Sequence, residues 1–290
     1  MQSHETASAH ASHVVSPSAL HRHMVRARTI SERMVALQRD AMVGFHTSSI
    51  GVESSIVAAV LAVEPGDWVF PDARGWYAAL ARGLPVATYV HHAFGSAADP
   101  AKGHSAPDHA PARAQNVVPP SGVIGAHLPQ AVGAAWAAKI KGETTGTLAL
   151  FGAEVAASGD FHNALNFAGV FGVSTVFVCR AQPGDDIVGR AVAYGLASAR
   201  VAARADEVFA VVREARARKG ATLIEVVGTE ESLAADDAVV AETNAELDRA
   251  ITEAKAAGLP APATMFDDVY AALPAHLRAQ RSLLGGNARG

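Results

Sequence analysis

The chain has 290 residues, of which 50% are hydrophobic and 18% charged, with a formal net charge of −4 and a pI near 6.3. This length suffices for one large globular domain with smaller appended segments, and the charge gives no basic field for nucleic acid. The single cysteine excludes an intramolecular disulfide framework. Without an apolar leader or an apolar run of about 18 residues, we expect a cytoplasmic protein that does not enter membranes.

The N-terminal part of the sequence predicts a tail, three helices and a strand. Residues 1–22 are rich in Ser, Ala and His without periodicity, so we expect a disordered tail whose histidines are solvated rather than metal-bound. Apolar residues recur at helical spacing over 23–41, which predicts an amphipathic helix. A second helix is expected over 52–63, a short buried strand over 68–70 and a further helix over 74–82.

The middle of the chain is organised around residues 146–182. An apolar run at 147–151 and a second run at 173–179 flank a helical segment, and both runs contain β-branched residues. This pattern is typical of a parallel strand–helix–strand unit. The carboxyl ends of its strands, near Gly152 and Arg180, meet at one edge of the sheet, where ligands of such sheets bind.

The remaining segments complete the expected fold. Residues 95–121 are expected to form a long loop, and helices are expected over 126–139, 186–199, 206–219 and 238–257, with a strand over 221–227 and an amphipathic piece over 265–273. The predicted fold class is α/β, a mostly parallel sheet with helices on both faces. We divide the chain into the tail 1–22, one domain over 23–258 and a C-terminal extension over 259–290.

Several blocks carry a resemblance to a known family. They are GFHTSSIGVES (44–54), KGHSAPDH (102–109), SGVIGAHLPQAVGAAWAAK (121–139), GDFHNALNFAG (159–169), FVCR (177–180) and LIE (223–225). In these blocks, and in their order, the chain resembles the alpha subunits of the thiamine-diphosphate-dependent 2-oxoacid dehydrogenases of the pyruvate and branched-chain type. The resemblance implies the thiamine-diphosphate-binding fold, with the cofactor bound across the interface to a beta subunit. It also implies an α2β2 assembly that decarboxylates a 2-oxoacid and passes the acyl group to the lipoyl group of an acyltransferase.

The resemblance assigns roles to individual residues of this chain. Arg74 and Arg180 match positions that bind the diphosphate, although both are also interpretable as surface or interface arginines. The segment Gly122-Val123-Ile124 matches the backbone that holds the aminopyrimidine ring. His109 matches a histidine near the substrate entrance and is the catalytic candidate.

The metal positions depart from the family pattern. The family holds magnesium with a Gly-Asp/Glu-Gly turn after the first strand of the unit and an Asn-Asn pair after the second, because magnesium requires oxygen ligands in octahedral geometry. When the chain is aligned to the family pattern without gaps, Ala153 stands in the carboxylate position. An alignment with one insertion and one deletion brings Glu154 to that position instead. At the second strand the pair is Ala181-Gln182, so Gln182 is the candidate ligand with its amide one methylene further out.

One further departure leaves two functions open. Where the family has a histidine-bearing loop after the third strand, this chain has GTEESLAADD (228–237), which is acidic. The first hypothesis is an alpha-type subunit with impaired or lost binding of thiamine diphosphate and magnesium. The alternative is a catalytically inactive paralogue that acts as a structural or regulatory subunit.

Overall fold

The computed structural model describes residues 15–229 and 233–286 of the chain. Most of the predicted tail, residues 1–14, lies outside the described residues. The first helix begins at Pro17, six residues before the expected start at 23, because Ser16 caps it by accepting a hydrogen bond from the backbone N–H of Ala19 at 3.1 Å.

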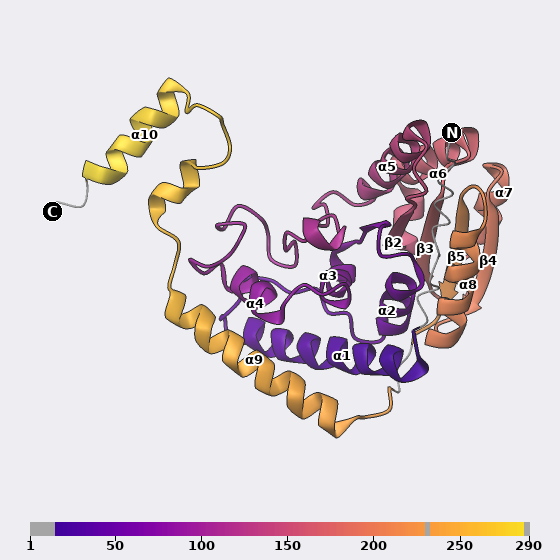
Figure 1. Cartoon of the computed structure of the whole chain (residues 1–290), viewed down its shortest axis with the longest axis horizontal. Helices are drawn as coiled ribbons and strands as arrows, with labels where there is room; N and C mark the ends of the chain where they lie inside the picture. The colour runs from indigo at the N-terminus through magenta and orange to yellow at the C-terminus, as the bar shows by residue number, and fades with distance from the viewer. Residues whose placement is uncertain (1–14, 230–232, 287–290) are drawn as a thin grey trace, which may run out of the picture.

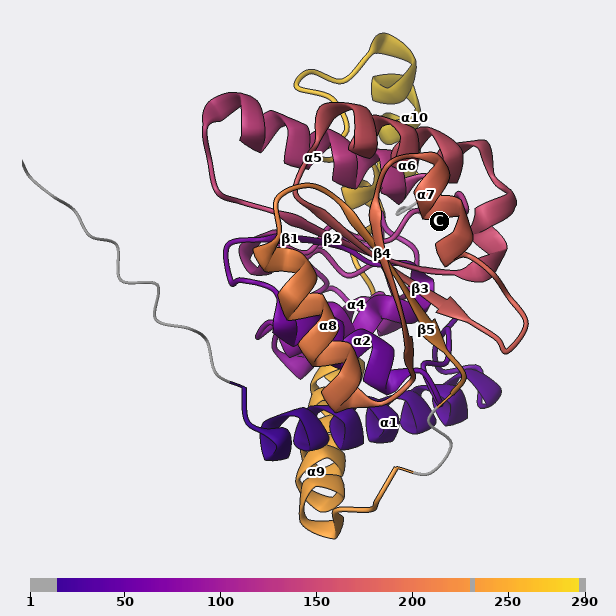
Figure 2. The same cartoon turned by 90° about the vertical axis from the view of Figure 1, so that its right-hand side faces the viewer.

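A five-stranded parallel sheet lies between two layers of helices, at the right-hand side of Figure 1 and in the middle of Figure 2. Its strands are β1 (Trp68–Phe70), β2 (Thr147–Gly152), β3 (Thr175–Ala181), β4 (Ala197–Ala202) and β5 (Thr222–Val227), in the spatial order β1-β2-β3-β5-β4. All neighbouring strands pair in parallel. The prediction of an α/β fold with a mostly parallel sheet is therefore confirmed.

Helices cover both faces of this sheet. The α-helices are α1 (Pro17–Arg39), α2 (Glu53–Ala62), α3 (Tyr77–Ala81), α4 (Val86–Phe94), α5 (His127–Lys141), α6 (Gly159–Phe171), α7 (Val188–Ala193), α8 (Ala205–Ala217), α9 (Asp237–Ala257) and α10 (Ala275–Gly286). Short 3-10 helices occur at η1 (Ala73–Trp76), η2 (Arg113–Gln115), η3 (Ala153–Ala157) and η4 (Pro262–Phe266). Within the described residues, no helix is both long enough and apolar enough to cross a membrane.

The central strands are hydrophobic along their whole length because both of their faces are buried. On β2, Leu148 and Leu150 face a core shared with α1, α2 and α8, whereas Ala149 and Phe151 face a second core shared with α5 and α6. Figure 2 shows α5 and α6 on one side of the sheet and α1 and α2 on the other. The two cores bury both faces of the central strands, so polar side chains can gather only where these strands end.

Helix α9 lies across α1 on the outside of this arrangement (Figure 1). Three ion pairs connect the two helices, namely Arg22–Glu242, Arg26–Glu246 and Arg33–Asp248. Helix α10 extends beyond α9, away from the sheet (Figure 1).

The helix expected over 186–199 is wrong in its second half. Helix α7 ends at Ala193, Gly195 follows with a φ of 71°, and residues from Ala197 form the edge strand β4. This strand alternates half-buried with exposed side chains, which is a period of two, but its small residues fit a helix equally well in the sequence. Helices α4 and α10 were not predicted.

Candidate functional site

The polar residues of the candidate site gather where β1, β2 and β3 end. Gly152, the last residue of β2, pairs in register with Arg180 near the end of β3. Asp72 follows β1 on the other side of β2. The parallel sheet thus brings three segments that are far apart in the sequence to one edge.

Arg180 is the most enclosed cation of this edge, with a side chain that is 8% exposed. Its Nη2 forms an ion pair with Oδ2 of Asp72, and Asp72 also accepts a hydrogen bond from the backbone N–H of Gly75 at Oδ1, at 3.1 Å. Nη1 of Arg180 is buried and has no hydrogen-bond partner among the residues that the structure describes. Arg180 therefore has one satisfied and one unsatisfied side.

Glu154 lies over the end of β2. It belongs to η3, is exposed to solvent, and folds its carboxylate back onto the α-carbon of Gly152, so that a Cβ at Gly152 would overlap both of its oxygens. The residue at 152 must therefore be glycine for Glu154 to adopt this position.

The charged side chains of this edge act on two buried groups, Cys179 and His127. Burial raises the pKa of the Cys179 thiol well above its usual range, and the carboxylate of Glu154 adds to this effect whereas Arg180 opposes it. Burial likewise lowers the pKa of His127, with Arg180 acting in the same direction and Asp72 against it. Cys179 is thus a buried, inert thiol.

The backbone of Gln182 belongs to the turn that follows β3. Its backbone N–H donates to Oδ2 of Asp185 at 2.8 Å, and its carbonyl accepts from the backbone N–H of Asp185 at 3.1 Å. The side chain is exposed, and no hydrogen bond joins it to Glu154 in the described chain. Among the described residues, no group of three or more His, Cys, Asp or Glu side chains could hold a metal ion.

Two of the remaining predicted residues lie beside the edge. Arg74 is exposed, and its Nη1 donates to the backbone carbonyl of Ser48 at 3.3 Å. Gly122, Val123 and Ile124 form an exposed loop before α5, in which Val123 is 64% and Ile124 67% exposed.

A glycine brings this loop close to the end of β2. Gly125 has a φ of 83°, and a Cβ there would meet Oγ of Ser158 at 2.9 Å and Cγ1 of Val155 at 3.0 Å. Any other residue would push the loop away from η3. The structure therefore brings the loop 122–124, Glu154 and Arg180 to one edge.

His109 lies apart from these residues, on the loop that follows α4. Its Nδ1 donates to the carbonyl of Pro107 at 2.7 Å, and in the described chain no hydrogen bond or ion pair joins it to Glu154, Gln182 or Arg180. The loop is held by a buried network next to His109.

The network centres on Asp108, which has a φ of 61° and is 2% exposed. Its Oδ1 accepts from Tyr89 Oη at 2.7 Å and bonds to His46 Nδ1 at 3.0 Å, and Nε2 of His46 bonds to Oγ of Ser31 at 3.0 Å. Every member is enclosed, so the network stabilises the loop without offering a reactive group to solvent.

We did not predict from the sequence that Asp72 and His127 lie at this site. Asp72 directly follows Phe70-Pro71 at the end of a predicted strand, so the rule that ligand sites lie beyond strand ends could have identified it. His127 opens α5, and its Nε2 donates to the carbonyl of Leu150 inside the core at 2.9 Å. No spacing in the sequence indicates that contact.

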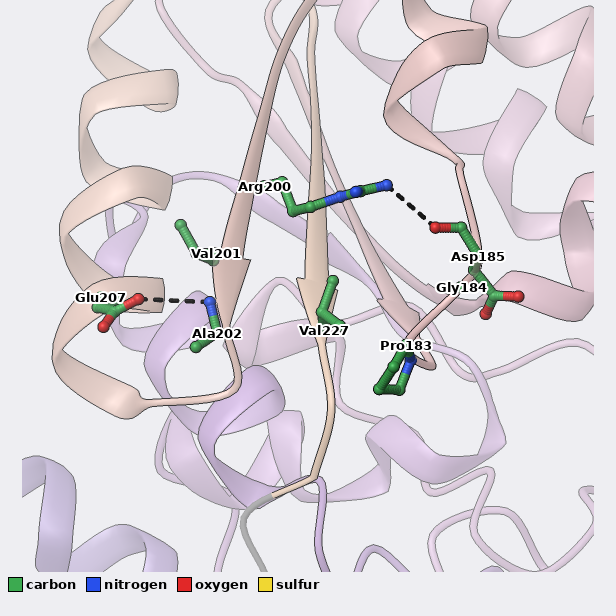
Figure 3. A pocket seen from close by; sticks show the side chains of 8 residues that line it. All are labelled: Pro183, Gly184, Asp185, Arg200, Val201, Ala202, Glu207 and Val227. Atoms are coloured by element: carbon green, nitrogen blue, oxygen red, sulfur yellow. Dashed lines mark hydrogen bonds between the residues drawn. The ribbon is translucent and has the colours of Figure 1, made fainter.

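An open cavity of about 500 Å³ lies at the ends of β3, β4 and β5 (Figure 3). It is lined by Pro183, Gly184, Asp185, Arg200, Val201, Ala202, Glu207 and Val227. Figure 3 shows that its polar groups bond to each other: Arg200 donates to the carbonyl of Asp185 at 3.0 Å, and Glu207 accepts from the backbone N–H of Ala202 at 3.3 Å. None of the predicted site residues lines it.

Comparisons with known proteins show the family to which the chain is similar. The family model of the dehydrogenase E1 component matches residues 21–229. The 2-oxoisovalerate dehydrogenase subunit alpha of Bacillus subtilis is 32% identical over 227 residues, which is 72% of this chain and 69% of that protein. The mitochondrial subunit alpha of Mus musculus is 31% identical over 213 residues, which is 68% of this chain and 48% of that protein.

Among solved structures, benzoylformate decarboxylase from Polynucleobacter necessarius aligns with a TM-score of 0.43 and 18% identity, covering 60% of this chain and 32% of that chain. The alpha subunit 1 of 2-oxoisovalerate dehydrogenase from Arabidopsis thaliana is 33% identical over 62% of this chain and 41% of that protein. The chain thus spans about half the length of the mitochondrial relatives. The family match covers most of the domain, and the chain belongs to the dehydrogenase E1 component family.

Proposed function

We propose that the chain is an alpha-type subunit of a thiamine-diphosphate-dependent 2-oxoacid dehydrogenase with impaired binding of the cofactor and its magnesium. The observation that carries this proposal is the state of the two metal positions. Ala153 and Ala181 offer no side-chain oxygen, Glu154 is folded onto Gly152, and Gln182 is turned into solvent.

The residues present do not fit a magnesium diphosphate. Magnesium requires oxygen ligands in a nearly ideal octahedral arrangement, so it tolerates little displacement of any one of them. The carboxylate of Glu154 is folded over Gly152 and the side chain of Gln182 is exposed, while Ala153 and Ala181 place no side-chain oxygen at the positions that the family resemblance assigns to the ligands. We therefore derive no reaction step through the cofactor from this chain.

The proposed partner is a beta-type subunit in an α2β2 assembly. Support comes from the outer surface of α5 and α6, where Ile140 is 71%, Val170 70%, Phe167 46% and Trp136 41% exposed. Apolar side chains gathered in this way on a surface are typical of protein interfaces. A lipoyl-bearing acyltransferase as a further partner and a cytoplasmic location are part of the same proposal.

A second candidate function is an inactive paralogue that supports or regulates a complete dehydrogenase. The acidic stretch 228–237 favours it, because this stretch replaces the histidine-bearing loop that the family resemblance predicts. Residues 230–232 of the stretch lie outside the described part of the chain.

Co-expression with a beta-type subunit of a 2-oxoacid dehydrogenase tests the proposed function. We expect an α2β2 complex in size-exclusion chromatography with light scattering, and failure of the two chains to co-purify would contradict the proposal. Decarboxylation of 2-oxoisovalerate by the complex at saturating magnesium and thiamine diphosphate then separates the two candidates. A slow, cofactor-dependent rate supports the impaired enzyme, whereas no rate above that of the beta subunit alone supports the inactive paralogue.

A further inference from the structure

We infer that Asp72 acts as a built-in anion that prevents a phosphate-bearing ligand from binding at Arg180. The inference rests on the proposed function for the location of the anion site. It goes further in naming the residue that closes the site and in treating the site as latent rather than lost.

The position of Asp72 is fixed from both sides. Its Oδ1 accepts from the backbone N–H of Gly75 and so caps η1, while its Oδ2 is paired with Nη2 of Arg180. Because β2 separates β1 from β3 in the sheet, this pair spans the end of β2. A ligand phosphate that approached Arg180 from the strand ends would have to displace the carboxylate.

The charges around Arg180 oppose a second anion. Asp72 neutralises Arg180 directly, and the carboxylate of Glu154 lies over Gly152, the residue paired with Arg180 in the sheet. An incoming phosphate would therefore meet a cation that Asp72 already neutralises, with the carboxylate of Glu154 over the adjacent strand end. The mostly buried carboxylate of Asp72 repels a phosphate at short range, where water screens the two charges only weakly.

One further observation supports a latent site. Nη1 of Arg180 is buried and has no partner in the described chain, although buried guanidinium groups are normally hydrogen-bonded throughout. Removing the charge of Asp72 would free Nη2 as well, and the two nitrogens of one guanidinium form the fork that binds phosphate in a bidentate manner.

The test is a calorimetric titration of sodium pyrophosphate into the full chain without magnesium or a partner. Asp72→Asn keeps an oxygen that accepts from Gly75 and removes the charge, so we expect pyrophosphate to bind this variant at least about tenfold more tightly than the wild type. Glu154→Gln in the same chain should strengthen binding further. Arg180→Gln in the Asp72→Asn background should abolish it.

Matched controls keep the result interpretable. Asp40→Asn makes the same change in net charge at the exposed residue that directly follows α1, and it should leave pyrophosphate binding at the wild-type level. Asp72→Ser, which also retains an acceptor for Gly75, replaces Asp72→Asn if that variant does not fold by circular dichroism.

Three outcomes would overturn the inference. They are equal binding by the wild type and Asp72→Asn, binding that survives Arg180→Gln, and an increase with Asp40→Asn that matches the one with Asp72→Asn. Failure of the chain to pair with a beta-type subunit would refute the proposed function alone, because the pyrophosphate assay uses no partner.

Discussion

Asp72 and Arg180 belong to strand ends that are not neighbours in the sheet, yet their side chains form an ion pair across the end of β2. Both side chains are mostly buried, with exposed fractions of 18% and 8%. The pair therefore affects both the stability of this edge and the ligands that the edge can accept.

Arg180→Gln should lower the free energy of unfolding by about 3 kcal/mol, because it leaves the buried carboxylate of Asp72 without its cation. Urea denaturation monitored by circular dichroism measures this change. The double variant Asp72→Asn/Arg180→Gln should recover part of the loss, since no unpaired charge remains. A cost of the double variant equal to the sum of the costs of Asp72→Asn and Arg180→Gln would show that the pair is not coupled.

Tyr89→Phe should destabilise the protein by about 1–3 kcal/mol, because it removes a buried donor from the carboxylate of Asp108. Burial and Asp108 raise the pKa of Tyr89 well above its ordinary value. The hydroxyl therefore keeps its proton and donates a hydrogen bond over the whole physiological pH range. Tyr194→Phe is the control, because the Tyr194 hydroxyl bonds to His162 at the exposed surface. Equal effects of the two substitutions on the urea midpoint would refute the role of the buried network.

The pH dependence of stability should reflect His127. Burial lowers the pKa of His127 below the ordinary value of 6.5. On acidification, His127 is therefore protonated in the unfolded chain at a higher pH than in the folded protein. The neutral ring thus contributes stability that is fully present above pH 6.5 and is lost as the pH falls from 6.5 toward the folded-state pKa.

His127→Gln retains a donor for the Leu150 carbonyl and does not titrate. We therefore expect its urea midpoint to fall less than that of the wild type between about pH 7 and about pH 5. Identical slopes for the two proteins would show that His127 does not contribute to the dependence.

The apolar surface of α5 and α6 should matter for assembly and not for the folding of the chain itself. Ile140→Glu and Val170→Glu change side chains that are 71% and 70% exposed, so the urea midpoint should stay within error of the wild type. Co-purification with a beta-type subunit should be lost. Leu283→Glu on α10, where Leu283 is 69% exposed, is the matched control. Assembly that survives both α5 and α6 variants would place the interface elsewhere.

The sequence predicted the central part of the fold well because its signals are local. The runs at 147–151 and 173–179 are hydrophobic throughout, as strands buried on both faces must be, and they became β2 and β3. The edge strand β4 was missed because its small residues carry little hydrophobic contrast between the two faces. Edge position is a property of the sheet, which a local pattern does not contain.

The candidate site was predicted only in part for a related reason. The strand-end rule located Glu154 and Arg180, and the structure places both at the same edge. It did not reveal that Asp72 pairs with Arg180 or that Gln182 turns into solvent, because these outcomes depend on side-chain contacts across the sheet. The roles that the resemblance assigns stay predictions for all of these residues: Arg74, His109, Glu154, Arg180, Gln182 and the segment Gly122–Ile124.

The most direct test of the account is a calorimetric titration of thiamine diphosphate with magnesium into the complex of this chain and a beta-type subunit. The account predicts that binding in the micromolar range is absent from the wild-type complex. It predicts that Ala153→Asp with Ala181→Asn and Asp72→Asn, which restores oxygen ligands and frees Arg180, introduces magnesium-dependent binding. Micromolar, magnesium-dependent binding by the wild type that disappears in Glu154→Ala would contradict the account and establish a working, rearranged cofactor site.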